Sequence, residues 1–286
     1  MKHVSVLRSM PVLICLAAVM ARHASASAVA VVLSDDQPAT QEALRGVLEV
    51  LPNARALALA EAGAGLAGAG VVVTLGQRAS GQRYDGAARM VAALVMDPGL
   101  ELPAGSAQVS PLPDAFSLMA TVRGLAPELQ VLGVLTGSGQ YQPYVHYLEA
   151  AGKVTGVRIL AKSVDSAPDL VSALRGMQGK AQALWLAPTP LLLGQKNFQF
   201  VSDYCRSTKL PLIAPVPELA GAGALAGVAP SAHDQGRAAG LAAKDLAAGK
   251  PVERSINVEQ NKVIISAKVA ASLGLKVGPR DGEIVP

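Results

Sequence analysis

The sequence predicts an α/β fold of two Rossmann-like lobes, each with a parallel sheet flanked by helices, and a ligand cleft between the lobes. Three observations lead to this prediction. Short apolar runs alternate with helical patterns, the scheme restarts midway at residues 131–135, and the proline-rich segment 110–113 separates the halves. Alternation of strands and helices is typical of βαβ units, whose strands lie parallel.

Each expected strand is a short run rich in Val, Leu and Ile, which is typical of parallel strands buried on both faces. These runs are residues 29–33, 71–75, 91–96, 131–135, 157–160, 183–187 and 212–214. Between them, apolar residues recur at helical spacing in residues 41–50, 115–125, 143–151, 167–177, 199–207 and 232–248. The tail, residues 256–275, predicts a closing strand at 263–265 and a short helix that ends at Gly274.

The restart of the pattern predicts where the lobes divide. Residues 29–125 are expected to form the N-terminal lobe, with residues 226–250 returning to it. Residues 126–225 are expected to form the C-terminal lobe, closed by residues 251–286. The first lobe is abbreviated between residues 50 and 71, which would leave the cleft more open.

The N-terminus predicts a secretory signal peptide over residues 1–28. Lys2 and Arg8 give a positive start, residues 10–20 are apolar, and Ala26-Ser27-Ala28 is a small-residue cleavage site near Ala28. The apolar run is about half of the roughly 20 residues that span a bilayer, which argues against a permanent anchor. A lipoprotein anchor at Cys15 is disfavoured because the preceding residue is a bulky isoleucine. The expected location is therefore the periplasm.

Charge and cysteine content exclude two further possibilities. Three of the 25 Lys and Arg residues lie in the leader, so that 22 remain against 21 Asp and Glu. The mature chain has no run of basic residues, so a surface that neutralises nucleic-acid phosphates is not expected. Cys205 is the single cysteine outside the leader, which excludes an intramolecular disulfide.

Motifs for catalysis or cofactor binding find no support. Residues 63–68 match the dinucleotide pattern GxGxxG, but the pattern needs a strand before it, whereas here a strand follows. The mature chain holds two histidines, His146 and His233, no GxSxG elbow and no cluster of metal ligands. A nucleophile, a base and an orienting group cannot be assembled, so neither an enzyme nor a bound cofactor or metal is predicted.

The loops at the carboxyl ends of the expected strands are small and polar, or contain Gly and Pro. In an open parallel sheet, ligands bind at this edge, so Ser34, Asp35 and Asp36 after the first strand form a candidate site. Helix capping is the alternative for at least one of the two aspartates, and the two functions can coexist.

Aromatic residues follow one of these loops. Tyr141, Tyr144 and Tyr147 lie along one helix face, either packed into the lobe or, for Tyr141, as a wall of the ligand pocket. Trp185 is expected in the core, and Cys205 as a small packed residue on a helix.

The mature chain resembles, over nearly its whole length, the ABC-transporter substrate-binding proteins of the tryptophan/tyrosine type. Its most specific parts are the strand before Pro188 and the block KLPLIAPVPELAGAGAL at residues 209–225. The other matching segments are residues 31–43, 72–79, 94–98, 109–125 running into 131–135, 236–246 and 256–275. The resemblance implies a type I periplasmic-binding fold, in which two lobes close around a small ligand.

The resemblance also implies which loops hold the ligand. By position, the ligand-binding residues would be Ser34, Asp35, Asp36, Thr74, Gly76, Ala79, Asp97, Ser138, Tyr141, Pro188, Thr189 and Glu218. Amino-acid-binding members tend to carry an acidic residue where this chain has Pro190. An amino-acid ligand would then need Asp36, Asp97 or Glu218 to hold its ammonium group.

The function implied is capture of a small molecule, such as an amino acid or related small acid, and delivery to an ABC permease in the inner membrane. A monomer that catalyses no reaction is expected. The alternative is a sensor or accessory protein that kept the fold, lost transport and acts through a membrane or secretion partner. The short first lobe and Pro190 motivate this alternative.

Overall fold

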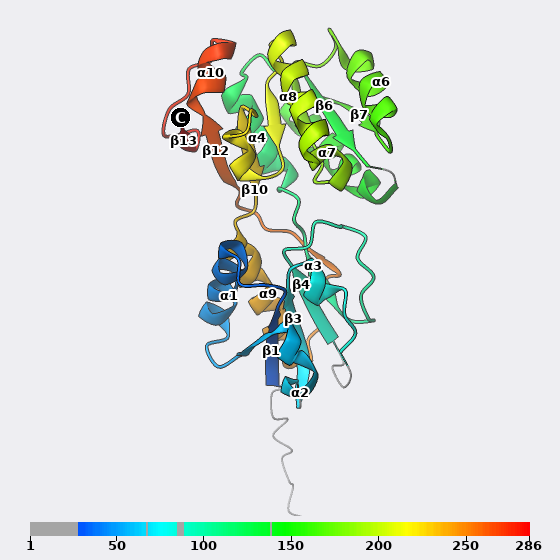
Figure 1. Cartoon of the computed structure of the whole chain (residues 1–286), viewed down its shortest axis with the longest axis vertical. Coiled ribbons are helices and arrows are strands. Elements are labelled where there is room, and N and C mark those ends of the chain that lie inside the picture. Colours follow the sequence, from blue (N-terminus) through cyan, green and yellow to red (C-terminus); the bar gives the residue numbers. More distant parts are fainter. Residues whose placement is uncertain (1–27, 67, 85–88, 138) are drawn as a thin grey trace, which may run out of the picture.

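Two lobes joined by three chain segments make up the part of the chain that the computed structural model describes, residues 28–66, 68–84, 89–137 and 139–286 (Figure 1). Each lobe has its own sheet flanked by helices, which confirms the predicted α/β fold. The expectations on the leader, including the alternative anchor at Cys15, concern residues that lie outside the described ones.

The sheet of the first lobe is parallel throughout, and its six described strands come from both ends of the chain. In spatial order they are β11 (Ser255–Ile256), β5 (Ala107–Val109), β4 (Arg89–Ala93), β3 (Ala69–Leu75), β1 (Ala28–Leu33) and β2 (Arg55–Ala58). The central strands β1 and β3 are apolar runs buried on both faces, as their composition predicts.

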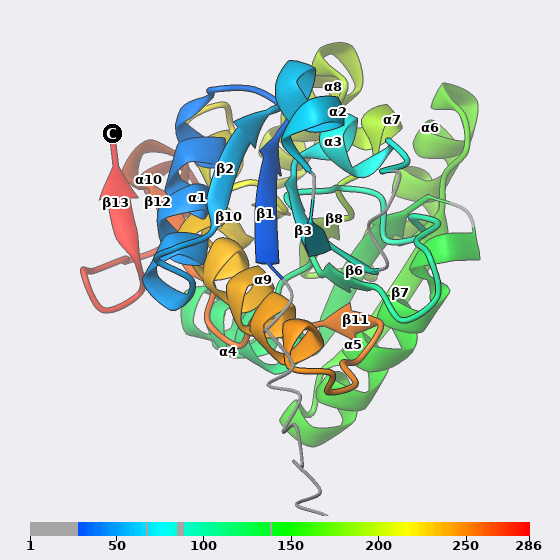
Figure 2. The ribbon, with the colours of Figure 1, turned by 90° about the horizontal axis from the view of Figure 1, so that it is seen from below.

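The two faces of this sheet are covered unequally. The long helices α1 (Pro38–Val50) and α9 (Ala232–Ala247) lie side by side on one face (Figure 2). The other face is covered by short pieces, a 3₁₀ turn (Leu59–Glu61), α2 (Ala62–Gly65) and α3 (Gln77–Ser80). In its described residues, the abbreviated segment between residues 50 and 71 thus still supplies an edge strand, but only one turn of α-helix.

Helices α1 and α9 approach each other closely because glycines line their contact. A Cβ atom added at Gly236 would lie 1.9 Å from the carbonyl oxygen of Ala43, and one at Gly46 would lie 2.1 Å from that of His233. Backbone packs directly against backbone here, so the absent side chains set the distance between the helices.

The sheet of the second lobe has seven strands in the described part of the chain. In spatial order they are β13 (Glu283–Val285), β12 (Lys262–Ser266), β10 (Ala226–Ala229), β9 (Leu212–Ala214), β8 (Ala183–Leu186), β6 (Val131–Thr136) and β7 (Arg158–Ser163). Strand β12 pairs antiparallel with β10, and all other neighbours pair parallel.

Helices cover both faces of the second sheet. One face carries α4 (Ala115–Leu125), α5 (Gln142–Thr155) and α10 (Ala267–Leu273), packed around the fully buried Trp185. The other face carries α6 (Ala167–Met177) and α8 (Gln195–Thr208), with Cys205 buried among apolar side chains. A single turn, α7 (Pro190–Leu193), and two 3₁₀ turns, Gly139–Tyr141 and Pro217–Ala220, complete the lobe. Both Trp185 and Cys205 therefore lie in the core as predicted.

The chain passes between the lobes at residues 110–114, 230–231 and 257–261. These positions correct the expected boundaries. Helix α4 packs on α5 in the second lobe rather than closing the first, and β10 stays in the second sheet before α9 returns. Strand β11, expected to close the second lobe, pairs with β5 of the first. Apolar periodicity predicts the helix but not the sheet against which it packs.

Both sheets share one strand order, which positions the site. The orders β2-β1-β3-β4-β5 and β7-β6-β8-β9-β10 each reverse direction between the first strand of the lobe and its third. Ligands of open α/β sheets bind outside the carboxyl ends of the strands at this point. Within the described ranges, no helix has the length and apolar character needed to cross a membrane.

Candidate ligand-binding site

A cavity of about 400 Å³ lies between the lobes, at the carboxyl ends of the strands. The first lobe contributes the loop between β1 and α1 and the residues after β3 and β4, among them Asp35, Gly76 and Met96. The second lobe contributes residues 215–218, which include Glu218, and Lys262 at the start of β12. The segments that cross between the lobes add further residues, including Pro230. Of the twelve predicted ligand-binding residues, three line this cavity: Asp35, Gly76 and Glu218.

A larger hollow of about 760 Å³ lies along the first lobe alone, beside Tyr84 and Arg89. It borders the amino end of β4, whereas ligands of this strand order bind at the carboxyl ends. The cavity between the lobes is therefore the better candidate site despite its smaller volume.

Asp35 supports the start of α1. Its Oδ1 accepts hydrogen bonds from the backbone N–H of Gln37 at 3.2 Å and from the Thr40 hydroxyl at 2.7 Å. The side chain is nevertheless exposed at the cavity, so helix support and ligand contact remain compatible. Asp36 is exposed beside it but is not among the residues that line the cavity.

Ser34, Thr74 and Ala79 are buried and hold the loops after β1 and β3 together. The Ser34 hydroxyl accepts a hydrogen bond from the N–H of Ala79 at 2.8 Å, and the hydroxyls of Thr74 and Ser80 are 2.8 Å apart. Gly76 has a φ of +98°, and a Cβ there would lie 2.7 Å from the Ser34 Oγ, so only glycine fits. These buried side chains fix the loops after β1 and β3 that border the cavity.

Tyr141 joins the two lobes beside the cavity. Its side chain is 1% exposed, and its hydroxyl lies 3.2 Å from the carbonyl oxygen of Pro188 and 3.5 Å from that of Met96 in the other lobe. Burial raises the pKa of Tyr141 to about 12, and the carboxylate of Asp97 adds to the increase. Tyr141 therefore remains a hydrogen-bond donor at physiological pH, packed at the lobe contact and not lining the cavity.

The remaining predicted residues lie near this contact or outside the described chain. The half-buried Asp97 accepts a hydrogen bond from the N–H of Gly99 at 2.8 Å through its Oδ1. The Thr189 hydroxyl caps α7 by accepting from the N–H of Leu192, and Pro188 beside it is buried. Ser138 lies outside the described residues.

Several cavity residues were not predicted from the sequence. Glu42 adds a third carboxylate to those of the predicted Asp35 and Glu218, and Lys262 adds the one ammonium group among the described lining residues. Gln235 also lines the cavity although it lies inside the expected helix 232–248. Lys262 and Gln235 reach the site because β12 and α9 both begin where the chain crosses between the lobes. The positions of these crossings depend on tertiary packing, and no local sequence pattern marks them.

Residues 90–279, more than half of the chain, match the family model described as ABC transporter substrate binding protein. The chain belongs to this family. This confirms the ABC-transporter substrate-binding family identified from the sequence, whereas the tryptophan/tyrosine type stays a prediction. Substrate-binding proteins of this family are extracytoplasmic, bind small molecules and work with ABC permeases, and they are typically not catalytic.

Several solved structures share the fold. The ligand-free, open structure of an adhesive substrate-binding protein from Clostridium difficile has a TM-score of 0.63 and 17% identity, covering 91% of this chain and 99% of that one. An ABC domain from Streptococcus pneumonia in complex with L-Trp has a TM-score of 0.58 and 17% identity, covering 90% and 100%. A conserved domain protein from Vibrio cholerae has a TM-score of 0.58 and 14% identity, covering 91% and 100%. A comparison with curated proteins gave no match.

The polar groups of the site are arranged for hydrogen bonding and charge recognition. In the described part of the chain, no group of three or more His, Cys, Asp and Glu side chains is placed to hold a metal ion. The cavity instead offers carboxylates, amides and an ammonium group on walls of proline and aliphatic side chains, which is typical of a small-molecule binding site.

Proposed function

We propose that this protein captures a small molecule, such as an amino acid or a related small acid, and delivers it to an ABC permease in the inner membrane without catalysing a reaction. It would act in the periplasm as a monomer, after removal of a signal peptide near Ala28. The observation that carries the proposal is the cavity lined by strand ends of both lobes in a chain of this family.

The chemistry of the cavity supports a ligand that carries charge of both signs. Three carboxylates can hold an ammonium group, and Lys262 can hold a carboxylate. Asp35 and Glu218 come from opposite lobes, so a ligand that contacts both would favour the closed arrangement over the open one. Closure would then create the surface that the permease recognises.

The predicted residues divide into three groups in this proposal. Asp35, Gly76 and Glu218 would contact the ligand directly, because they line the cavity. Four residues would support the site at the contact between the lobes: Asp97, Tyr141, Pro188 and Thr189. Ser138 and Asp36 stay predicted ligand contacts. Ser34, Thr74 and Ala79 would hold the binding loops in place from inside the first lobe.

Thermal unfolding with a panel of metabolites tests the proposal. A ligand that binds only the native state stabilises it by about 2.7 kcal/mol at a hundredfold excess over Kd. We expect at least one amino acid or small acid to raise the Tm, and native mass spectrometry to detect a small molecule retained on the protein. If nothing is retained and no metabolite raises the Tm, the proposal is wrong.

A pair of matched variants links binding to the cavity. Glu218→Gln removes a carboxylate that lines the cavity, and Glu253→Gln removes one that is exposed elsewhere. We expect Glu218→Gln to weaken binding at least tenfold and Glu253→Gln to leave it unchanged. Equal affinity of both variants would exclude Glu218 as a ligand contact.

A further inference from the structure

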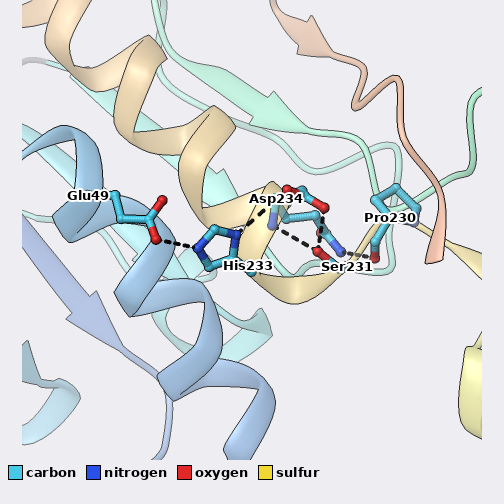
Figure 3. A network of polar contacts seen from close by, with 6 residues as sticks. Glu49, Pro230, Ser231, His233 and Asp234 are labelled. Carbon is cyan, nitrogen blue, oxygen red and sulfur yellow. Dashed lines mark hydrogen bonds and ion pairs between the residues drawn. The ribbon is translucent and has the colours of Figure 1, made fainter.

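Helix α9 begins at the edge of the cavity with a complete cap of its own. The Ser231 hydroxyl donates to Oδ2 of Asp234 at 2.6 Å and accepts from the N–H of Asp234 at 3.0 Å (Figure 3). Ser231 and Ala232 both line the cavity. This cap satisfies the N–H of Asp234, and the side chain one turn beyond Ser231 is the next polar group at the cavity.

That side chain is Gln235, which lines the cavity and is 7% exposed. Its Nε2 donates a hydrogen bond to the carbonyl oxygen of Pro230 at 3.2 Å, in the second segment that crosses between the lobes. Its Oε1 is buried and finds no hydrogen-bond partner among the described residues. A buried polar atom without a partner destabilises the fold, so its presence in a native protein calls for an explanation.

The chemistry of the unpaired atom is fixed by its neighbour. Exchanging Oε1 and Nε2 would place an amide oxygen against the carbonyl oxygen of Pro230, and two acceptors cannot share a hydrogen bond. The unpaired atom of Gln235 is therefore an acceptor. An N–H or O–H donor on a molecule bound in the cavity that Gln235 lines could supply the missing partner.

The charges around the cavity indicate which donor this is. Three carboxylates, Asp35, Glu42 and Glu218, line the same cavity, against the single ammonium of Lys262 among the described lining residues. This excess of negative charge favours a cation over a neutral hydroxyl and disfavours a simple acid. An ammonium group supplies both the charge and up to three N–H donors.

We propose that Gln235 is a ligand-binding residue whose Oε1 accepts a hydrogen bond from the ammonium group of an amine-bearing ligand. The inference rests on the proposed function and narrows its ligand class. Because Nε2 of the same amide holds the carbonyl of Pro230, the ligand is tied to the segment about which the lobes would move. Gln235 thus links occupancy of the cavity to the position of the crossing segment.

Three probes of one carbon skeleton test the ligand class. L-leucine carries an amine and an acid, 3-methylbutylamine only the amine, and 4-methylpentanoate only the acid. We expect L-leucine and 3-methylbutylamine to raise the Tm of the full protein, and 4-methylpentanoate to have no effect. A larger effect of 4-methylpentanoate than of the amine, or no effect of any probe, would overturn the inference.

Variants at Gln235 test the residue itself, by titration calorimetry with the amine probe that binds best. Gln235→Met removes the acceptor and should weaken binding at least tenfold, whereas Gln199→Met, exposed on α8, should bind like the wild type. Gln235→Glu keeps an acceptor oxygen, and its protonated carboxyl can still donate to the carbonyl of Pro230, so it should retain binding of the amine at acidic pH even if Gln235→Met folds poorly. Unchanged affinity of Gln235→Met, or loss of binding in Gln235→Glu with its Tm preserved, would overturn the role of Gln235.

These outcomes are separable from failure of the proposed function. If acids without an amine bind, or if Gln235→Met binds normally, the protein still captures a solute and only the inference fails. The proposed function itself fails when native mass spectrometry detects no retained molecule and the wider metabolite panel leaves the Tm unchanged.

Discussion

The side-chain hydroxyl of Tyr141, in the second lobe, lies close to the backbone of the first lobe. One O–H proton lies near two carbonyl oxygens, those of Pro188 in its own lobe and Met96 across the boundary. The shorter distance, to Pro188, is the stronger bond, so the contact with Met96 gains strength only if the lobes move closer. The hydroxyl can therefore respond to small changes in the angle between the lobes.

We predict that Tyr141→Phe lowers the free energy of unfolding by about 1 kcal/mol, the net value of one hydrogen bond. Tyr204→Phe is the matched control, because that hydroxyl donates to the carbonyl of Leu174 at 3.1 Å within one lobe. Urea denaturation measures both losses. Only Tyr141→Phe should also change the affinity for a ligand held between the lobes, and an unchanged affinity would argue against its function at the boundary.

His233 joins α9 to α1 and gives the first lobe a dependence on pH. Its Nε2 lies 2.8 Å from Oε1 of Glu49, and its Nδ1 lies 3.6 Å from Oδ1 of Asp234 (Figure 3). The hydrogen bond to Glu49 raises the pKa of His233 above its ordinary value of about 6.5. Burial opposes this increase, and the charges of Glu49 and Asp234 add to it.

Because its pKa is raised in the folded state, protonated His233 stabilises the fold through Glu49. This stabilisation is complete below about pH 6.5 and is lost as the pH rises through the folded pKa. We predict that the stability advantage of the wild type over His233→Gln shrinks between pH 6 and pH 9. Urea midpoints measured across this range check the prediction. A constant difference between the wild type and His233→Gln across this range would contradict the assignment.

The contact of α1 with α9 depends on the absence of side chains. We predict that Gly236→Ala destabilises the protein by about 1–3 kcal/mol, the usual cost of overpacking, because the carbonyl of Ala43 is 1.9 Å from the new Cβ and is backbone that cannot move aside. Gly124→Ala on α4 is the control, since a Cβ there meets no atom within 4 Å, and it should be neutral or stabilising. Equal stability of both variants in urea would contradict this account.

A strand is predictable from the sequence where its side chains are mostly β-branched or large and apolar. Strands β1, β3 and β6 are runs of Val and Leu, and their positions were predicted closely. Strands β2 and β10, with the sequences Arg-Ala-Leu-Ala and Ala-Gly-Val-Ala, were missed because Ala and Gly have little preference for strands. They are strands because neighbouring strands pair with them.

The site was predictable where it coincides with strand ends and not where it depends on the crossings. Asp35 and Gly76 directly follow β1 and β3, so the strand order brings them to the cavity. Gln235 reads as an ordinary polar residue on an amphipathic helix, and only the packing of α9 shows that it is buried. The spacing of apolar residues predicts which face of a helix packs into the core. It does not predict that a polar residue on another face, such as Gln235, lines a cavity.

Across the whole molecule, the lobes come close enough at Gly99 and Gln140 to be joined covalently. A Cβ added at Gly99 would lie 3.6 Å from the Cβ of Gln140, within the range of about 3.5–4.5 Å found in disulfides. We predict that the double variant Gly99→Cys with Gln140→Cys forms this bond under oxidising conditions and slows ligand exchange. Reduction should restore the wild-type rate, and each single variant is a control.

Thiol titration of the denatured protein measures the bond directly. Cys205 is buried and burial raises its pKa to about 12, so it should not compete for the new pair. If both introduced thiols remain free after oxidation, the lobes do not rest at this separation in solution.

The division of the first lobe between two distant parts of the chain also affects its synthesis. Its sheet lacks α9 and β11 until residues 232–256 have left the ribosome, long after β5 ends at Val109. At about 5–20 residues per second, this interval is on the order of ten seconds. During that time α1 covers this apolar face of the sheet without α9, so the packing of the lobe is incomplete. A nascent chain in this state is accessible to chaperones and suited to translocation in the unfolded form, which fits a protein proposed to act outside the cytoplasm.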